Sequence, residues 1–262
     1  MSTKWKALIA IIAVAVIVAV AIVLINRPAD PASQPEPSEG TGPVAGKFGF
    51  PISKINIGEG GTKTDSDGKT ITGYNGTCES AAQAAANYTH LIEDVNTSTW
   101  SQQKKVLAEV GKPGAWVGRV TSSGELVANA KELPPGAFDG GWYSRSDVAS
   151  GGLYRVASCE AKKSAVVQVF TGGTTARANG APKAYFRTVT LELAWAGDWK
   201  INDAAIVQDG QDFSGRVKDA GPTSLGVSFD GESAPALTND MVNGFFADVT
   251  REGWVEYANA KR

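Results

Sequence analysis

An uninterrupted apolar segment near the N-terminus constrains this chain more than any other feature. Residues 7–25 are 19 consecutive apolar residues, rich in Val, Ile and Ala. As a helix with a rise of 1.5 Å per residue, the segment is roughly 29 Å long, close to the hydrocarbon thickness of a bilayer. In lipid, a helix satisfies its own backbone N–H and C=O groups. The segment therefore predicts a transmembrane helix, through which the chain contacts the membrane.

A cleaved signal peptide is the alternative interpretation of this segment. The apolar region of a signal peptide usually has about 7–15 residues and ends at a small-x-small cleavage site. Here the run is longer, and it ends in the bulky residues Val23, Leu24 and Ile25, followed by Asn-Arg-Pro. This length and this flank favour an anchor that stays attached.

Flanking charges predict the orientation of the span. Two lysines precede it, whereas Arg27 on the other side is followed by three acidic residues. Because Lys and Arg stay preferentially on the cytoplasmic side, residues 1–6 are predicted to be a cytoplasmic tail. We therefore expect a single-pass protein of the cell membrane with an extracytoplasmic C-terminal domain.

A second segment of unusual composition follows the span. Residues 26–46 are rich in proline and poor in large apolar side chains, which predicts an extended linker. The whole chain carries 25 Lys+Arg and 27 Asp+Glu, a net charge of −2. No basic stripe interleaves with aromatic residues, so direct binding of nucleic acid is not expected.

The cysteines and the histidine limit the chemistry. An oxidising compartment permits a disulfide between Cys78 and Cys159, worth about 2–4 kcal/mol for a loop of about 80 residues. Two separately buried thiols are the alternative, because sequence does not give their separation. His90 is the only histidine, which excludes a multi-histidine metal site. We expect no cofactor, no metal and no catalytic residue.

Helical patterns occupy the middle of the chain. Residues 47–76 mix apolar residues with a glycine-rich polar loop and predict a strand/loop extension. A helix is predicted from the N-cap Thr77, a second from Ser98 or Thr99 to Val110, and a short one around 125–132. The inward face of the first helix is defined by helical spacing and comprises Ala81, Ala85, Tyr88, Ile92 and Val95.

Strand patterns dominate after residue 150. Segments 152–159, 164–172 and 183–195 are rich in β-branched or alternating apolar residues and predict strands. A short strand is predicted at 225–229. The stretch WAGDWK (195–200) predicts a hairpin with a three-residue loop.

The apolar pattern sets the register that we expect for this hairpin. The predicted pairs are Trp195 with Trp199, Leu193 with Ile201, and Val189 with Ala205. In this register Asp203 points to the apolar face beside Leu191. Asp203 is therefore the candidate residue for a pocket, where a carboxylate could act as a general base.

Residues 209–262 are predicted to be a C-terminal extension with an amphipathic helix that begins at Thr238. Phe245, Phe246, Trp254 and Tyr257 are candidate partner-binding residues, because exposed aromatic side chains often anchor interfaces. For Trp254 and Tyr257, packing in the core is the favoured alternative, since the preceding helix is equally apolar.

The order of these elements, with the WAGDWK hairpin at its end, resembles the nuclear-transport-factor-2-like fold over residues 77–208. That resemblance implies an α+β domain in which a curved antiparallel sheet wraps the helices into a cone. The layout of tail, span, linker and domain is similar to bitopic assembly proteins of type IV secretion and conjugation systems (the VirB-eight-like and TcpC-like group). It is also similar to membrane proteins associated with Mce lipid importers.

A group of uncharacterised actinobacterial single-pass membrane proteins resembles the chain more closely, through TCESAAQAAANY (77–88), WAGDWK (195–200) and GWVEY (253–257). The resemblance implies a membrane-anchored binding or assembly component of an envelope complex, with conjugation or type IV secretion-like transfer as the leading context. Other envelope proteins, and copies of the chain itself in a homo-oligomer, are the implied partners. An Mce-associated lipid-transport subunit and a small-ligand-binding or enzymatic cone domain are the alternatives.

Overall fold

The computed structural model describes residues 46–94, 100–128, 143–176, 180–206, 217, 219–224 and 229–262. The predicted tail (1–6), the predicted span (7–25), the linker up to residue 45 and Val95 lie outside these ranges. Within the described ranges, no helix combines the length and the hydropathy that are needed to cross a bilayer.

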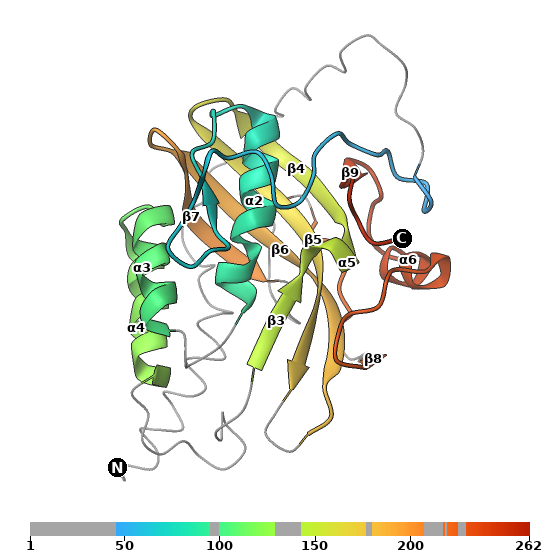
Figure 1. Ribbon diagram of the computed structural model, residues 1–262. Helices are drawn as coiled ribbons and strands as arrows, with labels where there is room; N and C mark the ends of the chain where they lie inside the picture. The colour runs from blue at the N-terminus through green and yellow to red at the C-terminus, as the bar shows by residue number, and fades with distance from the viewer. Residues whose placement is uncertain are drawn as a thin grey trace.

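The described part of the chain is built on a seven-stranded antiparallel sheet (Figure 1). The strand order is β7-β6-β5-β4-β9, while β3 pairs with β5 and β8 pairs with β6; β1 and β2 form a separate two-stranded sheet. The α+β class with an antiparallel sheet is thus confirmed. The strands are β1 (Lys63–Thr64), β2 (Ile71–Thr72), β3 (Tyr143–Asp147), β4 (Leu153–Glu160), β5 (Ser164–Ala176), β6 (Lys183–Trp195), β7 (Trp199–Ile206), β8 (Phe229–Asp230) and β9 (Trp254–Glu256).

The helices lie at several places around this sheet (Figure 1). α2 lies across the sheet against β5, α3 and α4 lie beside β7, and α6 lies near β9. The predicted N-caps are confirmed, because Thr77 accepts a hydrogen bond from Ser80 N and Thr238 accepts one from Met241 N. The helices are α2 (Cys78–Glu93), α3 (Trp100–Val110), α4 (Ala115–Ala128), α5 (Val148–Gly151) and α6 (Asn239–Phe245).

α4 differs from its prediction. The helix expected around 125–132 begins at Ala115, ten residues earlier, and residues 129–132 lie outside the described ranges. Contact with α3 explains its position. Gly124 of α4 lies so close to the ring of Trp100 that an added Cβ would be 2.0 Å from it. A glycine that looks like a helix breaker in the sequence is therefore what lets the two helices approach.

α2 is buried on more than the predicted face. Ala81 and Ala85 are fully buried as expected, but so are Ala82 and Ala84. The reason is that a second segment covers α2 on the side opposite the sheet. Gly58 N donates to Asn87 Oδ1 at 2.9 Å, and Asn87 Nδ2 donates to the backbone carbonyl of Glu59 at 3.0 Å. The segment before β1 thus runs along α2, and only small side chains fit between the two.

The sheet has a hydrophobic cluster on each face. Successive residues of a strand point to opposite faces, and accordingly Val169 of β5 belongs to the cluster under α2 whereas Phe170 belongs to the cluster under α6. The second cluster is aromatic and includes Phe48, Phe50, Phe186, Phe246 and Trp254.

The two ends of the described chain meet at the edge of the sheet. Ser53 N donates to the carbonyl of Glu256 at 2.9 Å, and Glu256 N donates to the carbonyl of Pro51 at 2.8 Å. β9 in turn pairs with β4. The segments predicted as separate extensions, 47–76 and 209–262, are therefore both bound to the sheet of the predicted 77–208 domain.

The predicted disulfide is present. Cys78 and Cys159 are joined, with their Cα atoms 5.9 Å apart and a sequence separation of 81 residues. The bond connects the first residue of α2 to the end of β4. The alternative of two separate thiols is therefore wrong.

We expect that deleting residues 250–262 unfolds the domain. The deletion removes β9 together with Trp254 and Tyr257, which are 1% and 0% exposed. Loss of a buried large aromatic side chain costs about 3–5 kcal/mol, against a total stability of about 5–15 kcal/mol. Near-UV circular dichroism and denaturant unfolding would measure this loss, with the exposed substitution Asp248→Ala as control. A truncated chain that still unfolds cooperatively would contradict the expectation.

Candidate functional site

The β6–β7 hairpin organises one surface of the domain. Three residues form its loop, with Trp195 opposite Trp199 and Leu193 opposite Ile201, as predicted. Gly197 has φ +80°, a conformation that glycine adopts without strain. Asp198 accepts three backbone N–H bonds, from Gly73 at 2.7 Å, Tyr74 at 3.0 Å and Trp199 at 2.9 Å. Its carboxylate thereby joins the hairpin to the segment that leads into α2.

The predicted pairing of Val189 with Ala205 is wrong. A β-bulge between Glu192 and Leu193 shifts the register, so that Val189 pairs with Ile206 and Leu191 pairs with Ala204. One extra residue on the bulged strand moves every later side chain by one position.

Asp203 is displaced by the same bulge. It pairs with Glu192 instead of lying beside Leu191, and its carboxylate lies 3.6 Å from Arg119 of α4 in an ion pair. The structure thus places Asp203 next to a cation at the junction of β7 and α4. Asp203 therefore does not lie in the apolar setting on which the pocket hypothesis was based.

A polar groove of about 400 Å³ lies beside the hairpin loop. Four of its lining residues carry charges of both signs. Lys200 Nζ also donates to the carbonyl of Glu109 at 2.7 Å, which links β7 to the end of α3. The groove is lined by Lys63, Thr72, Gly73, Glu109, Ala196, Gly197, Asp198 and Lys200.

One carboxylate that lines the groove has a shifted pKa. A side-chain hydrogen bond with Asp65, and then the charge of Asp65, raise the pKa of Glu109. Small-molecule sites are mostly apolar with a few polar groups. A groove with charges of both signs suits a polar segment of a protein partner better than an apolar ligand.

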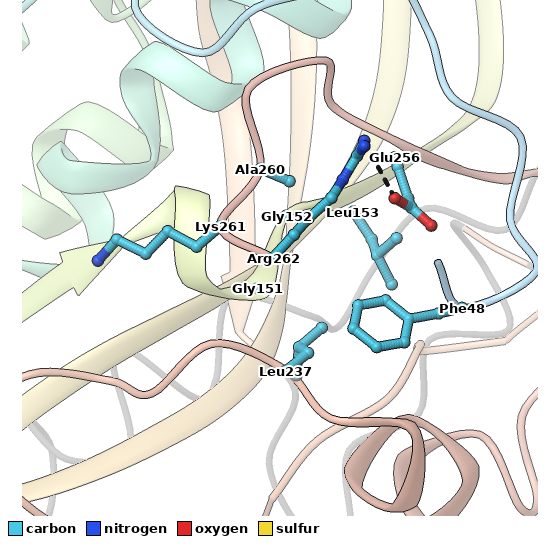
Figure 2. A pocket seen from close by; sticks show the side chains of 9 residues that line it. All are labelled: Phe48, Gly151, Gly152, Leu153, Leu237, Glu256, Ala260, Lys261 and Arg262. Atoms are coloured by element: carbon cyan, nitrogen blue, oxygen red, sulfur yellow. Dashed lines mark ion pairs between the residues drawn. The ribbon is translucent and has the colours of Figure 1, made fainter. Parts of the chain in front are cut away.

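A second hollow, near the C-terminus, is too small to be a ligand site (Figure 2). Its volume is about 10 Å³, which is room for about one water molecule. Figure 2 shows the ion pair at its edge, where Arg262 Nη2 lies 3.2 Å from Glu256 Oε2. Burial raises the pKa of Glu256, and the charge of Arg262 lowers it in part. We interpret this hollow as a packing contact that closes the chain end onto β9.

A buried charge cluster lies at the end of α2. Glu93, whose side chain is 0% exposed, accepts hydrogen bonds through Oε2 from Arg187 Nε at 2.7 Å and from the Tyr185 hydroxyl at 3.0 Å. Burial alone would lower the pKa of Arg187, but Glu93 reverses this effect and raises it. Burial raises the pKa of Tyr185. The cluster is therefore a charged pair that joins α2 to β6.

Three of the predicted aromatic residues of the C-terminal segment lie in the second hydrophobic cluster or against it, whereas Tyr257 belongs to the first cluster, under α2. Phe246, Trp254 and Tyr257 are buried and Phe245 is partly buried. Ring centroids are 5.8 Å apart for Phe246 and Trp254, and 4.5 Å apart for Tyr257 and Tyr154. For Trp254 and Tyr257, this is the arrangement that the core-packing alternative describes.

Sequence reasoning missed Asp198 and Glu93, although a signal existed for the second. The period of a strand puts Arg187 on the same face as Val189 and Leu191, which the pattern marks as buried. A buried cation requires a carboxylate partner. Nothing comparable singles out Asp198, because two of its three partners, Gly73 N and Tyr74 N, belong to a segment more than a hundred residues away.

Comparison with known proteins found no matching family model, no matching curated protein and no matching solved structure. The fold, the disulfide and the groove define the class of protein: a disulfide-bonded α+β domain with an open polar groove. Within the described residues, no group of three or more His, Cys, Asp or Glu side chains is arranged to hold a metal ion.

We predict that Asp198→Ala lowers the free energy of unfolding by about 1–3 kcal/mol. The substitution leaves three partly buried backbone N–H groups without their acceptor, and water in the groove replaces that acceptor only in part. Urea unfolding would measure the change. Lys200→Ala, which removes one exposed hydrogen bond from the same groove, serves as control, and an equal loss in both variants would contradict the prediction.

A double-mutant cycle tests the charge cluster. Glu93→Leu alone leaves the guanidinium of Arg187 without its anion, and we expect a loss of about 3–5 kcal/mol. Glu93→Leu combined with Arg187→Met removes both charges, so most of that loss should be recovered. Additive losses in denaturant unfolding would show that the two side chains do not act as a pair.

Proposed function

We propose that the chain is a single-pass membrane protein whose extracytoplasmic nuclear-transport-factor-2-like domain binds other proteins of an envelope complex. Conjugation or type IV secretion-like transfer is the proposed context. Residues 7–25 provide the anchor in this proposal, and residues 26–46 set how far the domain reaches from the membrane.

The disulfide is the observation that carries the proposal. Structural disulfides persist in oxidising compartments and are rare in the cytosol, where thiols are kept reduced. Cys78 and Cys159 lie in the part of the chain that the flanking charges place outside the cytoplasm. Two independent features, one in the N-terminal segment and one in the domain, thus support the same location.

Binding through the polar groove is the mechanism that we propose for the domain. Its walls come from the β1–β2 hairpin, the end of α3 and the β6–β7 loop, and Asp198 ties two of these walls together. A surface that is already ordered loses little conformational entropy when a partner docks. The buried aromatic residues of the C-terminal segment would instead have to leave the core before they could contact a partner.

One observation favours the small-ligand alternative. Glu93 Oε1 is buried and makes no hydrogen bond to the described residues, and a buried carboxylate oxygen of this kind costs free energy unless a donor satisfies it. A cationic or hydroxyl-bearing ligand at the end of α2 would supply such a donor.

Reporter fusions and thiol alkylation test the proposed location. We expect a C-terminal alkaline phosphatase fusion to be active and a C-terminal green fluorescent protein fusion to be dark. Alkylation of the native protein should leave Cys78 and Cys159 unmodified until reductant is added. An active cytosolic reporter, or free thiols in the native protein, would contradict the proposal.

Site-specific photo-crosslinking in intact cells tests the binding surface. A photoreactive residue at Lys63, in the groove, should crosslink to envelope proteins, whereas one at Asp240, an exposed position on α6, should not. Equal crosslinking from both positions would argue against the groove. Recovery of lipid-importer subunits from Lys63 would favour the Mce-associated alternative.

A further inference from the structure

His90 lies in the last turn of α2, where it contacts the loop between β1 and β2. Its ring makes two contacts with this loop, at 3.1 Å from Nε2 to Thr70 Oγ1 and at 3.4 Å from Nε2 to Asp67 Oδ2. Its other ring nitrogen, Nδ1, lies 2.8 Å from the carbonyl oxygen of Asn87. We name His90, Asp67 and Thr70 the His90 cluster.

The contact of Nδ1 fixes one proton. A backbone carbonyl only accepts hydrogen bonds, so Nδ1 must carry a hydrogen to contact Asn87 O at this distance. In a neutral imidazole, the other nitrogen would then be an acceptor without a hydrogen.

The hydroxyl of Thr70 does not supply a hydrogen to that acceptor. Thr70 Oγ1 lies 2.6 Å from Asp67 Oδ2, the shortest contact in the cluster. Burial alone would raise the pKa of Asp67, but hydrogen bonds from His90, Thr70 and the Lys69 backbone lower it well below its ordinary value. Asp67 is therefore a carboxylate, and the single hydrogen of the Thr70 hydroxyl is donated to it.

Only acceptors then face Nε2 of His90. These are the lone pairs of Thr70 Oγ1 and the carboxylate oxygen of Asp67. The contacts are satisfied when Nε2 carries a hydrogen as well as Nδ1, which is the positively charged imidazolium.

We propose that the His90 cluster is a pH-sensitive contact that holds the β1–β2 loop against α2 when His90 is charged and releases it when His90 loses its proton. The loop is the tip of the hairpin whose strands contribute Lys63 and Thr72 to the polar groove. The state of His90 thus controls how firmly one wall of the groove is held. The inference does not depend on the proposed function.

Several charged groups surround the His90 cluster. Asp67 is the charged group in contact with His90; α3 touches the same loop through Gln102, whose Nε2 donates to Ser66 O at 2.9 Å. Other charged residues on these elements are Asp65 and Lys69 of the loop, and Lys104, Lys105 and Glu109 of α3. Because its pKa is lowered, Asp67 stays charged above the ordinary carboxylate range of about 4. The pKa of Glu109 is raised by its contact with Asp65 of the same loop, so a change in the loop is assigned to His90 only where it coincides with the titration of the His90 ring.

The chain has a single histidine, so the ring of His90 can be observed without ambiguity. The experiment uses the full chain in detergent micelles, without a histidine tag and with isotope-labelled histidine. Ring chemical shifts give the pH at which His90 loses its proton. Hydrogen exchange of the amides of residues 65–70, corrected for intrinsic exchange, gives the protection of the loop at each pH.

We expect the loop to exchange about tenfold faster once His90 is neutral, because hydrogen bonds to charged groups are the stronger ones. The titration of the His90 ring and the change in loop exchange should have the same midpoint pH. In His90→Gln the loop protection should not change with pH, because the side-chain amide donates hydrogen bonds but does not titrate, while Lys69→Gln, a change in the same loop outside the cluster, should behave like the unmodified chain. Loop protection that does not change across the titration of His90, or that changes equally in His90→Gln, overturns the proposal.

Discussion

The close fit of α2 between the sheet and the segment before β1 is the constraint on which the rest of the fold depends. A helix packed on both sides has room only for small side chains, and Ala81, Ala82, Ala84 and Ala85 are all fully buried. Tyr88 is a large residue of the same helix, and its side chain forms a hydrogen bond. The hydroxyl of Tyr88 donates to Trp199 O at 2.9 Å, which fixes the helix against β7.

Residues at the two ends of α2 hold other parts of the molecule in place. Cys78 at its start is bonded to β4, while Glu93 and His90 at its end hold β6 and the β1–β2 loop. Burial of Glu93 and Arg187 does not necessarily stabilise the fold, because desolvation can cancel the attraction between the charges. Such a pair instead disfavours alternative packings, in which either charge would be buried alone. The position of α2 is thus specified by the contacts at its two ends and by the small size of the side chains along its length.

Features encoded by neighbouring residues could be predicted from the sequence. The caps at Thr77 and Thr238 depend on a side chain and an N–H three residues later, and the Trp195–Trp199 pair depends on a three-residue loop. The bulge at Glu192 left no such local pattern, so it was missed, and with it the position of Asp203. β9 was missed because three residues are too few for a period, and because its partners, Pro51 and β4, are about 100 to 200 residues away.

The same separation in sequence explains why the groove could not be predicted. Its walls come from three distant segments, and the carboxylate of Asp198 that joins two of them belongs to a Gly-Asp turn, where a polar residue needs no further explanation. The chain enters the fold elsewhere, at residues 46–53 beside β9, and β9 pairs with the start of β4. The turn that follows the other end of β4 contacts the hairpin, where Trp195 N donates to the carbonyl of Lys163. If residues 7–25 anchor the protein as proposed, tension on the linker acts first on the contacts with β9 and not on the groove. If the groove binds a partner as proposed, attachment to the membrane and binding then place demands on separate parts of the sequence.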